Sequence, residues 1–144
     1  MKPLVATILV LLAVPAWGLD YRTTARAAIL HDAPSQASGK LAVVGSNVPL
    51  EVIVDTAEWV KVRDPNGHLS WIEKSALGNS RSVMVKVDEA IVRQQANPDA
   101  ETAFRATRGV VLEALGEPTA LGWLQVRHVN GPVGWLRLHE VWGQ

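Results

Sequence analysis

The chain contains one sequence pattern twice, and this repeat constrains its fold more than any other feature. Trp59-Val60-Lys61-Val62-Arg63 returns 64 residues later as Trp123-Leu124-Gln125-Val126-Arg127. At the same offset, Asn66-Gly67 and Trp71-Ile72 return as Asn130-Gly131 and Trp135-Leu136. A repeat of this kind indicates two copies of one structural module. We expect the copies at 28–77 and 90–141, with a two-residue insertion in the second copy near Gly116-Glu117-Pro118.

Each copy is predicted to form five short strands. Short runs of apolar and β-branched residues, bounded by Gly, Pro, Asn or Asp, are typical of strands and turns. The strands are expected at 27–31, 40–44, 49–54, 59–63 and 69–73, and again at 90–93, 102–106, 110–115, 123–127 and 133–136. Five strands in so short a module favour a small, partly open β-barrel, because closing a sheet removes exposed edges. The predicted fold class is all-β, and only 97–106 has a competing helical pattern.

The segment between the two copies is predicted to be packed. Val83, Val85 and Val87 alternate with polar or smaller residues, as in a half-buried strand. We therefore expect a close junction at this segment. The predicted domains are a signal peptide at 1–18, a first barrel at 19–78, a connecting segment at 79–89 and a second barrel at 90–144.

The first residues have the pattern of a secretory signal peptide. Lys2 precedes an apolar run from Leu4 to Val14, and small residues stand at Ala16 and Gly18 before the expected cleavage. The apolar run is too short for a membrane-spanning helix of ~20 residues. The protein is therefore expected to be exported, with a periplasmic location and no membrane span after cleavage.

Composition excludes several functions. The 14 basic and 14 acidic side chains balance, so no basic surface predicts nucleic acid as a partner. The chain has no cysteine, which removes thiol catalysis and cysteine metal ligands. The four histidines have no spacing typical of a metal site and are expected at the surface: His31, His68, His128 and His139. No cofactor, metal or catalytic residue is predicted, and the chain is not expected to be an enzyme.

The ordered series of motifs resembles the bacterial SH3-like (SH3b) domain family. The resemblance rests on Ile29 to Ser35, Leu50-Glu51-Val52, Trp59 to Arg63, Asn66-Gly67, Trp71-Ile72 and Ala76-Leu77. The second copy is similar, except that Arg93-Gln94-Gln95-Ala96 replaces the proline-containing first turn. The resemblance implies two tandem small SH3-like β-barrels that act as binding or targeting modules in cell-envelope proteins.

Eukaryotic relatives of this fold bind polyproline helices in an aromatic groove. By similarity, Trp59 matches the groove tryptophan and Trp71 an aromatic at the groove edge. The other groove positions carry His31, Glu73 and Ala76, which do not supply the parallel aromatic walls of such a site. In the second copy Trp123 and Trp135 match, while Arg93, Arg137 and Glu140 fill the other places. Binding of proline-rich peptides is therefore not expected.

The candidate ligand-binding residues follow from strand alternation. In 59–63, Val60 and Val62 are expected to face the core, which places Trp59 on the surface beside basic side chains. Such tryptophans can stack on a sugar ring or a peptide plane. The alternative is that each tryptophan only covers its own hairpin or the interface between the copies. The predicted ligand-binding residues are Trp59, Lys61, Arg63, Trp71, Trp123, Gln125, Arg127 and Trp135.

The functional expectation is an exported, non-enzymatic binding protein of the bacterial cell envelope. Its first candidate ligand is peptidoglycan, through the glycan or the stem peptide. The alternative is a periplasmic protein–protein adaptor or assembly factor that uses a sheet edge or the junction between the copies. A third possibility is a degraded hydrolase.

Overall fold

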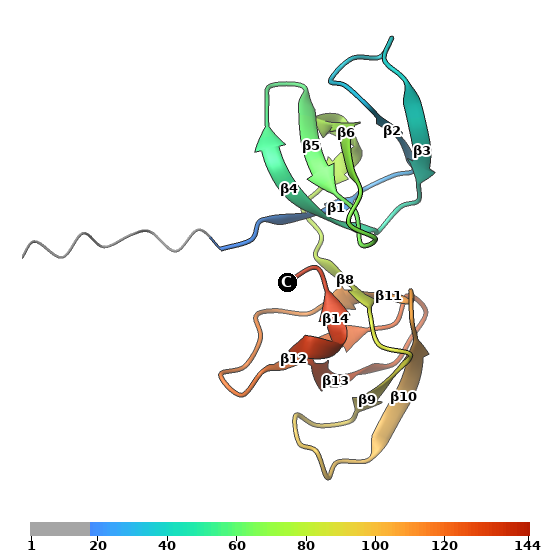
Figure 1. Cartoon of the computed structure of the whole chain (residues 1–144). Coiled ribbons are helices and arrows are strands. Elements are labelled where there is room, and N and C mark those ends of the chain that lie inside the picture. The colour runs from blue at the N-terminus through green and yellow to red at the C-terminus, as the bar shows by residue number, and fades with distance from the viewer. Residues whose placement is uncertain (1–17) are drawn as a thin grey trace, which may run out of the picture.

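A computed structural model describes residues 18–144, so the predicted signal peptide lies outside the described residues except for Gly18. In this part of the chain two antiparallel sheets form two separate small barrels (Figure 1). The first sheet has seven strands in the spatial order β3 (Lys40–Val44), β2 (Ala28–His31), β6 (Leu69–Glu73), β5 (Trp59–Arg63), β4 (Pro49–Asp55), β1 (Tyr21–Thr24) and β7 (Leu77–Gly78).

The second sheet repeats the first strand for strand. Its order is β10 (Thr102–Thr107), β9 (Glu89–Arg93), β13 (Val133–Arg137), β12 (Trp123–Arg127), β11 (Val111–Ala114), β8 (Ser82–Val85) and β14 (Val141–Trp142). A short 3-10 turn follows β6 at Lys74–Ala76, and another follows β13 at Leu138–Glu140. The structure therefore confirms the prediction of an all-β chain with two tandem modules.

All ten predicted strands are present, with bounds that shift by at most one residue. Each sheet also contains two strands beyond the five repeated ones: β1 and β7 in the first barrel, β8 and β14 in the second. Of these, β8 is the strand that the alternation of Val83 and Val85 indicates. The segment 97–106 forms a turn and strand β10, and the competing helical pattern is not realised there. The added strands are short, and β7 and β14 have only two residues each, too few for a periodic pattern.

Each barrel has its own core, formed by the inward faces of the strands. In β5, Val60 and Val62 are fully buried, as their alternation predicts. Leu50 and Ile72 complete the centre of the first core, and Leu112, Leu124, Val126 and Leu136 occupy the matching positions of the second. Burial of a large aliphatic side chain stabilises a fold by about 1.5–3 kcal/mol, so these residues provide most of the stability of so small a module.

The hairpin between β5 and β6 ends in a tight turn, as predicted. Asp64 accepts backbone hydrogen bonds from Asn66 and His68 on its Oδ1 atom, both at 2.9 Å. Gly67 has a φ of 89°, which glycine adopts without steric cost. These contacts fix the register in which Trp59 lies opposite Glu73.

The barrels meet through the segment predicted to connect them. Ser82–Val85 forms β8 of the second sheet, so these four residues of the predicted connecting segment belong to the second barrel, and Val83 and Val85 lie in its core. The backbone N–H of Ser82 donates to Thr23 Oγ1 at 3.1 Å, and the two hydroxyls lie 3.0 Å apart. The C-terminus returns to the space between the barrels (Figure 1). The junction is therefore a packed one.

Two aromatic rings add to this junction. Tyr21 of β1 and Trp142 of β14 meet edge to face, with ring centroids 5.0 Å apart. Desolvation raises the pKa of the Tyr21 phenol, and the nearby Glu51 carboxylate raises it further. Trp142 thus docks the end of the chain on the first barrel.

Candidate functional site

The two repeated tryptophans are buried, which corrects the prediction that they lie on the surface. Trp59 is 8% exposed and Trp123 is 4% exposed. Both project from the outward face of their strands, as alternation predicts, but other segments of the same barrel cover that face. Alternation predicted the direction in which each tryptophan side chain points, but it did not predict the segments that pack over that side chain.

His31 packs against Trp59. Its ring meets the indole edge to face, with centroids 5.1 Å apart. His31 itself is 3% exposed, so the prediction of a surface histidine is wrong at this position. The bulge between Leu30 and His31 in β2 shifts the strand register at this point, which simple alternation does not anticipate. Ser38 Oγ lies 3.3 Å from His31 Nδ1 and ties the ring to the loop 32–39.

A pocket of about 530 Å³ opens beside Trp59. It lies between the loop that joins β2 to β3, the loop that joins β4 to β5, and the 3-10 turn after β6. Its lining residues are Gln36, Ala57, Glu58, Trp59, Glu73, Lys74 and Ser75. One aromatic wall, two carboxylates, an amide, an ammonium and a hydroxyl thus line one cavity, as in sites that fix the orientation of a small ligand or a peptide group.

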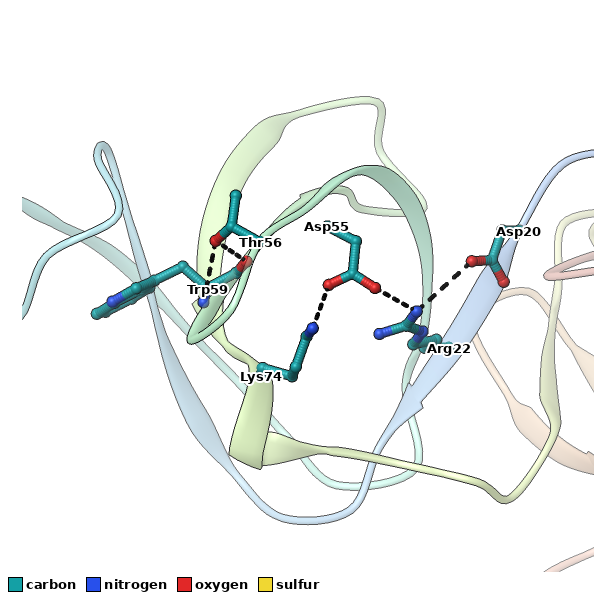
Figure 2. A network of polar contacts seen from close by, with 6 residues as sticks. All are labelled: Asp20, Arg22, Asp55, Thr56, Trp59 and Lys74. Atoms are coloured by element: carbon teal, nitrogen blue, oxygen red, sulfur yellow. Dashed lines mark hydrogen bonds and ion pairs between the residues drawn. The ribbon is translucent and has the colours of Figure 1, made fainter.

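Hydrogen bonds of Thr56 shape the loop that carries Glu58. The Thr56 hydroxyl donates to the carbonyl oxygen of Trp59 at 2.6 Å, and the Trp59 N–H donates back to that hydroxyl at 3.3 Å. Figure 2 shows these bonds, with the indole directed away from Asp55. Lys74 N–H donates to the Glu58 carbonyl oxygen at 2.8 Å, which joins this loop to the 3-10 turn.

Lys74 is held at the rim of the pocket by Asp55. Its ammonium lies 2.6 Å from Asp55 Oδ1, while Arg22 lies 2.6 Å from Oδ2 of the same carboxylate (Figure 2). The hydrogen bond from Lys74, followed by that from Arg22, lowers the pKa of Asp55. The Lys74 charge is therefore directed toward Asp55 rather than toward Trp59.

Glu73 is held by two partners from the N-terminal part of the barrel. Arg26 Nη2 lies 3.3 Å from Glu73 Oε2 and 3.2 Å from Ser75 Oγ. The Gln36 amide donates to the other oxygen of Glu73. In contrast, Glu58 makes no ion pair with any residue of 18–144.

The other predicted residues of the first barrel lie outside this pocket. Lys61 and Trp71 are cross-strand partners on the same outward face as Trp59. Arg63 pairs with Glu51 at 2.7 Å, near the opposite end of β5. Of the four residues predicted in this barrel, the structure places only Trp59 in the pocket.

The second barrel has a different arrangement around its tryptophan. Arg137 lies over the Trp123 ring, with the guanidinium carbon 4.2 Å from the ring centroid. Its Nη1 atom donates to the Leu121 carbonyl oxygen at 3.1 Å. Gln125 lies opposite Trp135, as Lys61 lies opposite Trp71. Arg127 pairs with Glu113 at 2.8 Å and takes the place of Arg63.

The pocket residues that sequence reasoning missed come from loops. Gln36, Glu58 and Lys74 lie in or beside turns, where no periodic pattern marks the direction of a side chain. The sequence marks Glu73 as unsuited to a polyproline groove but does not place it in a pocket beside Trp59. One sequence feature could have identified this position: the charge is reversed between the two copies, with Glu73 in the first and Arg137 at the matching position of the second.

Neither a metal cluster nor a membrane-spanning helix is found in the described part of the chain. Within 18–144, no three His, Asp or Glu side chains are grouped to hold an ion. The same residues include no helix long and apolar enough to cross a bilayer.

Two small barrels, each with a tryptophan at the start of its fifth strand, define a tandem SH3-like architecture. The profile of the family described as bacterial SH3 domain matches residues 25–78 and 86–143, which together make up most of the chain. The chain therefore belongs to the bacterial SH3 domain family and contains two tandem copies of its domain.

The solved structures that are similar to this chain belong to longer proteins. NlpC2 and NlpC1 from Trichomonas vaginalis are each 12% identical with a TM-score of 0.40, and the matches cover 86% and 96% of this chain but 47% and 51% of theirs. An NlpC/P60 family protein from Bacillus cereus ATCC 10987 is 17% identical with a TM-score of 0.38, over 85% of this chain and 56% of that one. The chain thus spans about half the length of these proteins. No curated protein is similar enough in sequence to match it.

Proposed function

We propose that the protein is an exported, non-enzymatic binding protein of the bacterial cell envelope, located in the periplasm, and that its first barrel binds peptidoglycan or a wall peptide. The observation that carries the proposal is the pocket beside Trp59. The signal-peptide pattern of residues 1–18 and membership of the bacterial SH3 domain family support the cellular setting.

The dimensions and lining of the pocket support a peptide or sugar ligand. A volume of about 530 Å³ is within the range of ligand pockets. The indole edge supplies an apolar contact for a ring or an alkyl chain, and the surrounding carboxylates and amide offer hydrogen bonds. The pocket is open on one side, so it can accept one group of a large polymer without enclosing the polymer.

The direct test is co-sedimentation of purified residues 19–144 with isolated peptidoglycan sacculi. We expect saturable binding that persists at about 0.15 M salt, where charges separated by more than ~8 Å are largely screened. Tryptophan fluorescence should change on binding because Trp59 lines the pocket. Absence of sedimentation at every protein concentration would reject the proposal, and release of soluble muropeptides would reject its non-enzymatic part.

A second candidate function is a periplasmic adaptor, and the edge strand β3 favours it. β3 ends the first sheet and exposes 57% of Leu41 and 73% of Val43. An apolar edge with an unpaired side can accept a strand from another protein. At the position matching Val43, the second barrel carries Arg105, which pairs with Glu89.

Cross-linking in the envelope distinguishes the adaptor from the wall-binding protein. An adaptor should yield one stoichiometric protein partner that is lost in Val43→Lys, while sacculus binding is absent. If Val43→Lys leaves the cross-linked partner unchanged, β3 is not the contact surface.

A further inference from the structure

We propose that the pocket of the first barrel selects a cationic amino group on a peptide, whereas the matching position of the second barrel is closed by its own Arg137. The inference deepens the proposed function and rests on it, because it names the chemical group that the first barrel recognises. It follows from the difference between two copies of one module.

The second barrel shows that a cation fits over this tryptophan. Strand register places Arg137 opposite Trp123, as it places Glu73 opposite Trp59. The Arg137 guanidinium lies on the Trp123 ring at 4.2 Å and is fixed by the Leu121 carbonyl oxygen. A cation in this position is attracted by the negative face of the indole. In the second barrel, an arginine of the same domain therefore occupies the cation position over the tryptophan ring.

The first barrel has the opposite charge at this position. Glu73 replaces the arginine, and a pocket opens beside Trp59, whose ring packs against His31 and has no internal cation over it. Glu58 projects from the neighbouring loop and also lines this pocket. Two carboxylates next to an indole make a site that favours a positive ligand group and disfavours a negative one.

The cations near this pocket do not neutralise both carboxylates. Lys74 is paired with Asp55 at 2.6 Å, and Arg26 is shared between Glu73 and Ser75. Within the described residues, Glu58 is left without an ionic partner. A ligand ammonium can therefore reach Glu58 without displacing an internal ion pair.

These charges favour an ammonium on a peptide over a neutral sugar. A sugar hydroxyl can donate a hydrogen bond to Glu58, but a neutral sugar carries no positive charge to pair with this carboxylate. A primary amine on a flexible side chain has three donors and an alkyl stem that can lie along the indole edge. Peptides that carry such an amine occur in the wall and in proteins, so the test must separate these two sources.

The first experiment compares native sacculi with sacculi whose free amines have been acetylated. The purified chain should bind acetylated sacculi about tenfold more weakly, because acetylation removes the charge and two of the donors. Glu58→Gln should show a similar loss on native sacculi and little further loss after acetylation. Glu101→Gln, at an exposed position of the second barrel, is the matched control and should bind as the parent chain does.

A soluble probe makes the inference independent of the sacculus. Tryptophan fluorescence is titrated with a short alanine–lysine peptide and with the same peptide acetylated on its side-chain amine. A response to the free amine alone, lost in Glu58→Gln, supports amine selection. If sacculi do not bind but this response is present, the proposed wall function fails and amine selection stands.

Two results would overturn the inference. Equal binding of native and acetylated sacculi, with equal responses to both peptides, would leave wall binding in place and reject amine selection. No response to the free-amine peptide would reject it whatever the sacculi do. Arg137→Ala tests closure separately: acrylamide should quench the fluorescence more strongly because Trp123 is uncovered, and unchanged quenching would reject closure.

Discussion

Arg137 lies over the indole of Trp123, and its guanidinium carbon is 4.2 Å from the ring centroid. The matching pair in the first barrel is Glu73 and Trp59, which are cross-strand partners with a pocket beside them. The same two backbone positions thus give a closed barrel end in one copy and an open one in the other. This difference, rather than the shared fold, is the reason for proposing the ligand site in the first barrel.

Arg137→Ala should lower the free energy of unfolding of the chain by about 0.5–2 kcal/mol, between the values for an exposed and a desolvated cation on an aromatic ring, because Trp123 is buried and Arg137 is half-buried. Urea unfolding followed by circular dichroism measures the change. Arg105→Ala is the control, because Arg105 is 57% exposed in its ion pair with Glu89 and should cost less. Equal losses in the two variants would show that the contact with Trp123 adds nothing.

Asp55 should make the free energy of unfolding of the chain depend on pH in the acidic range. Lys74 and Arg22 lower the pKa of Asp55 in the folded chain. The stabilisation from these ion pairs is therefore complete at a pH above the unfolded-state pKa near 3.8, and it is lost as the pH falls through the folded-state pKa. The difference in unfolding free energy between the parent chain and Asp55→Asn should therefore shrink at low pH. Asp99→Asn, which breaks no ion pair among residues 18–144, should show no such convergence. A constant difference down to pH 2 would contradict the assignment.

Ser70→Ala should stabilise the chain. Ser70 is 5% exposed, and its hydroxyl has no hydrogen-bond partner in the described part of the chain. Removing a buried unpaired polar group recovers about 1 kcal/mol. Ser82 is the matched control, because it is 4% exposed and its hydroxyl lies 3.0 Å from Thr23 Oγ1. Ser82→Ala should lower the melting temperature, and a fall in both variants would refute the prediction.

Gly134 stands where the first barrel has Ser70, and Gly134→Ala should destabilise the second barrel. A Cβ at this position would lie 2.7 Å from the Arg93 carbonyl oxygen and 2.6 Å from Val92 Cγ1. Overpacking of this kind costs about 1–3 kcal/mol. Gly131→Ala meets nothing within 4 Å and is the control for thermal unfolding. Similar melting temperatures for the two variants would show that β9 can move away from β13 at little cost.

The sequence predicted the parts of the fold that follow from local pattern. Alternation in 59–63 correctly placed Val60 and Val62 in the core and Trp59 on the outward face. It did not predict the burial of Trp59, because His31 covers the indole from a strand 28 residues earlier in the chain. Burial of this kind depends on tertiary contacts that one strand does not encode.

The pocket was harder to predict than the barrels for the same reason. Trp59 was identified from the repeat, whereas Glu58 and Gln36 reach the pocket from loops whose paths depend on contacts such as those of Thr56. Lys61 and Trp71 share the outward face of Trp59 but lie outside the pocket. The 3-10 turn and the two loops that enclose the pocket meet at the end of β5 where Trp59 lies. Register predicts which residues share a face and does not predict where loops enclose it.

The most direct test of the central claim compares Trp59→Phe with Trp123→Phe in binding to native sacculi. Each substitution replaces a buried tryptophan by a smaller ring at the corresponding strand position of its own barrel, so the effects on folding should be similar. The account predicts that Trp59→Phe weakens binding severalfold, while Trp123→Phe binds as the parent chain does. Equal binding by both variants, or a loss confined to Trp123→Phe, would contradict the placement of the binding site in the first barrel.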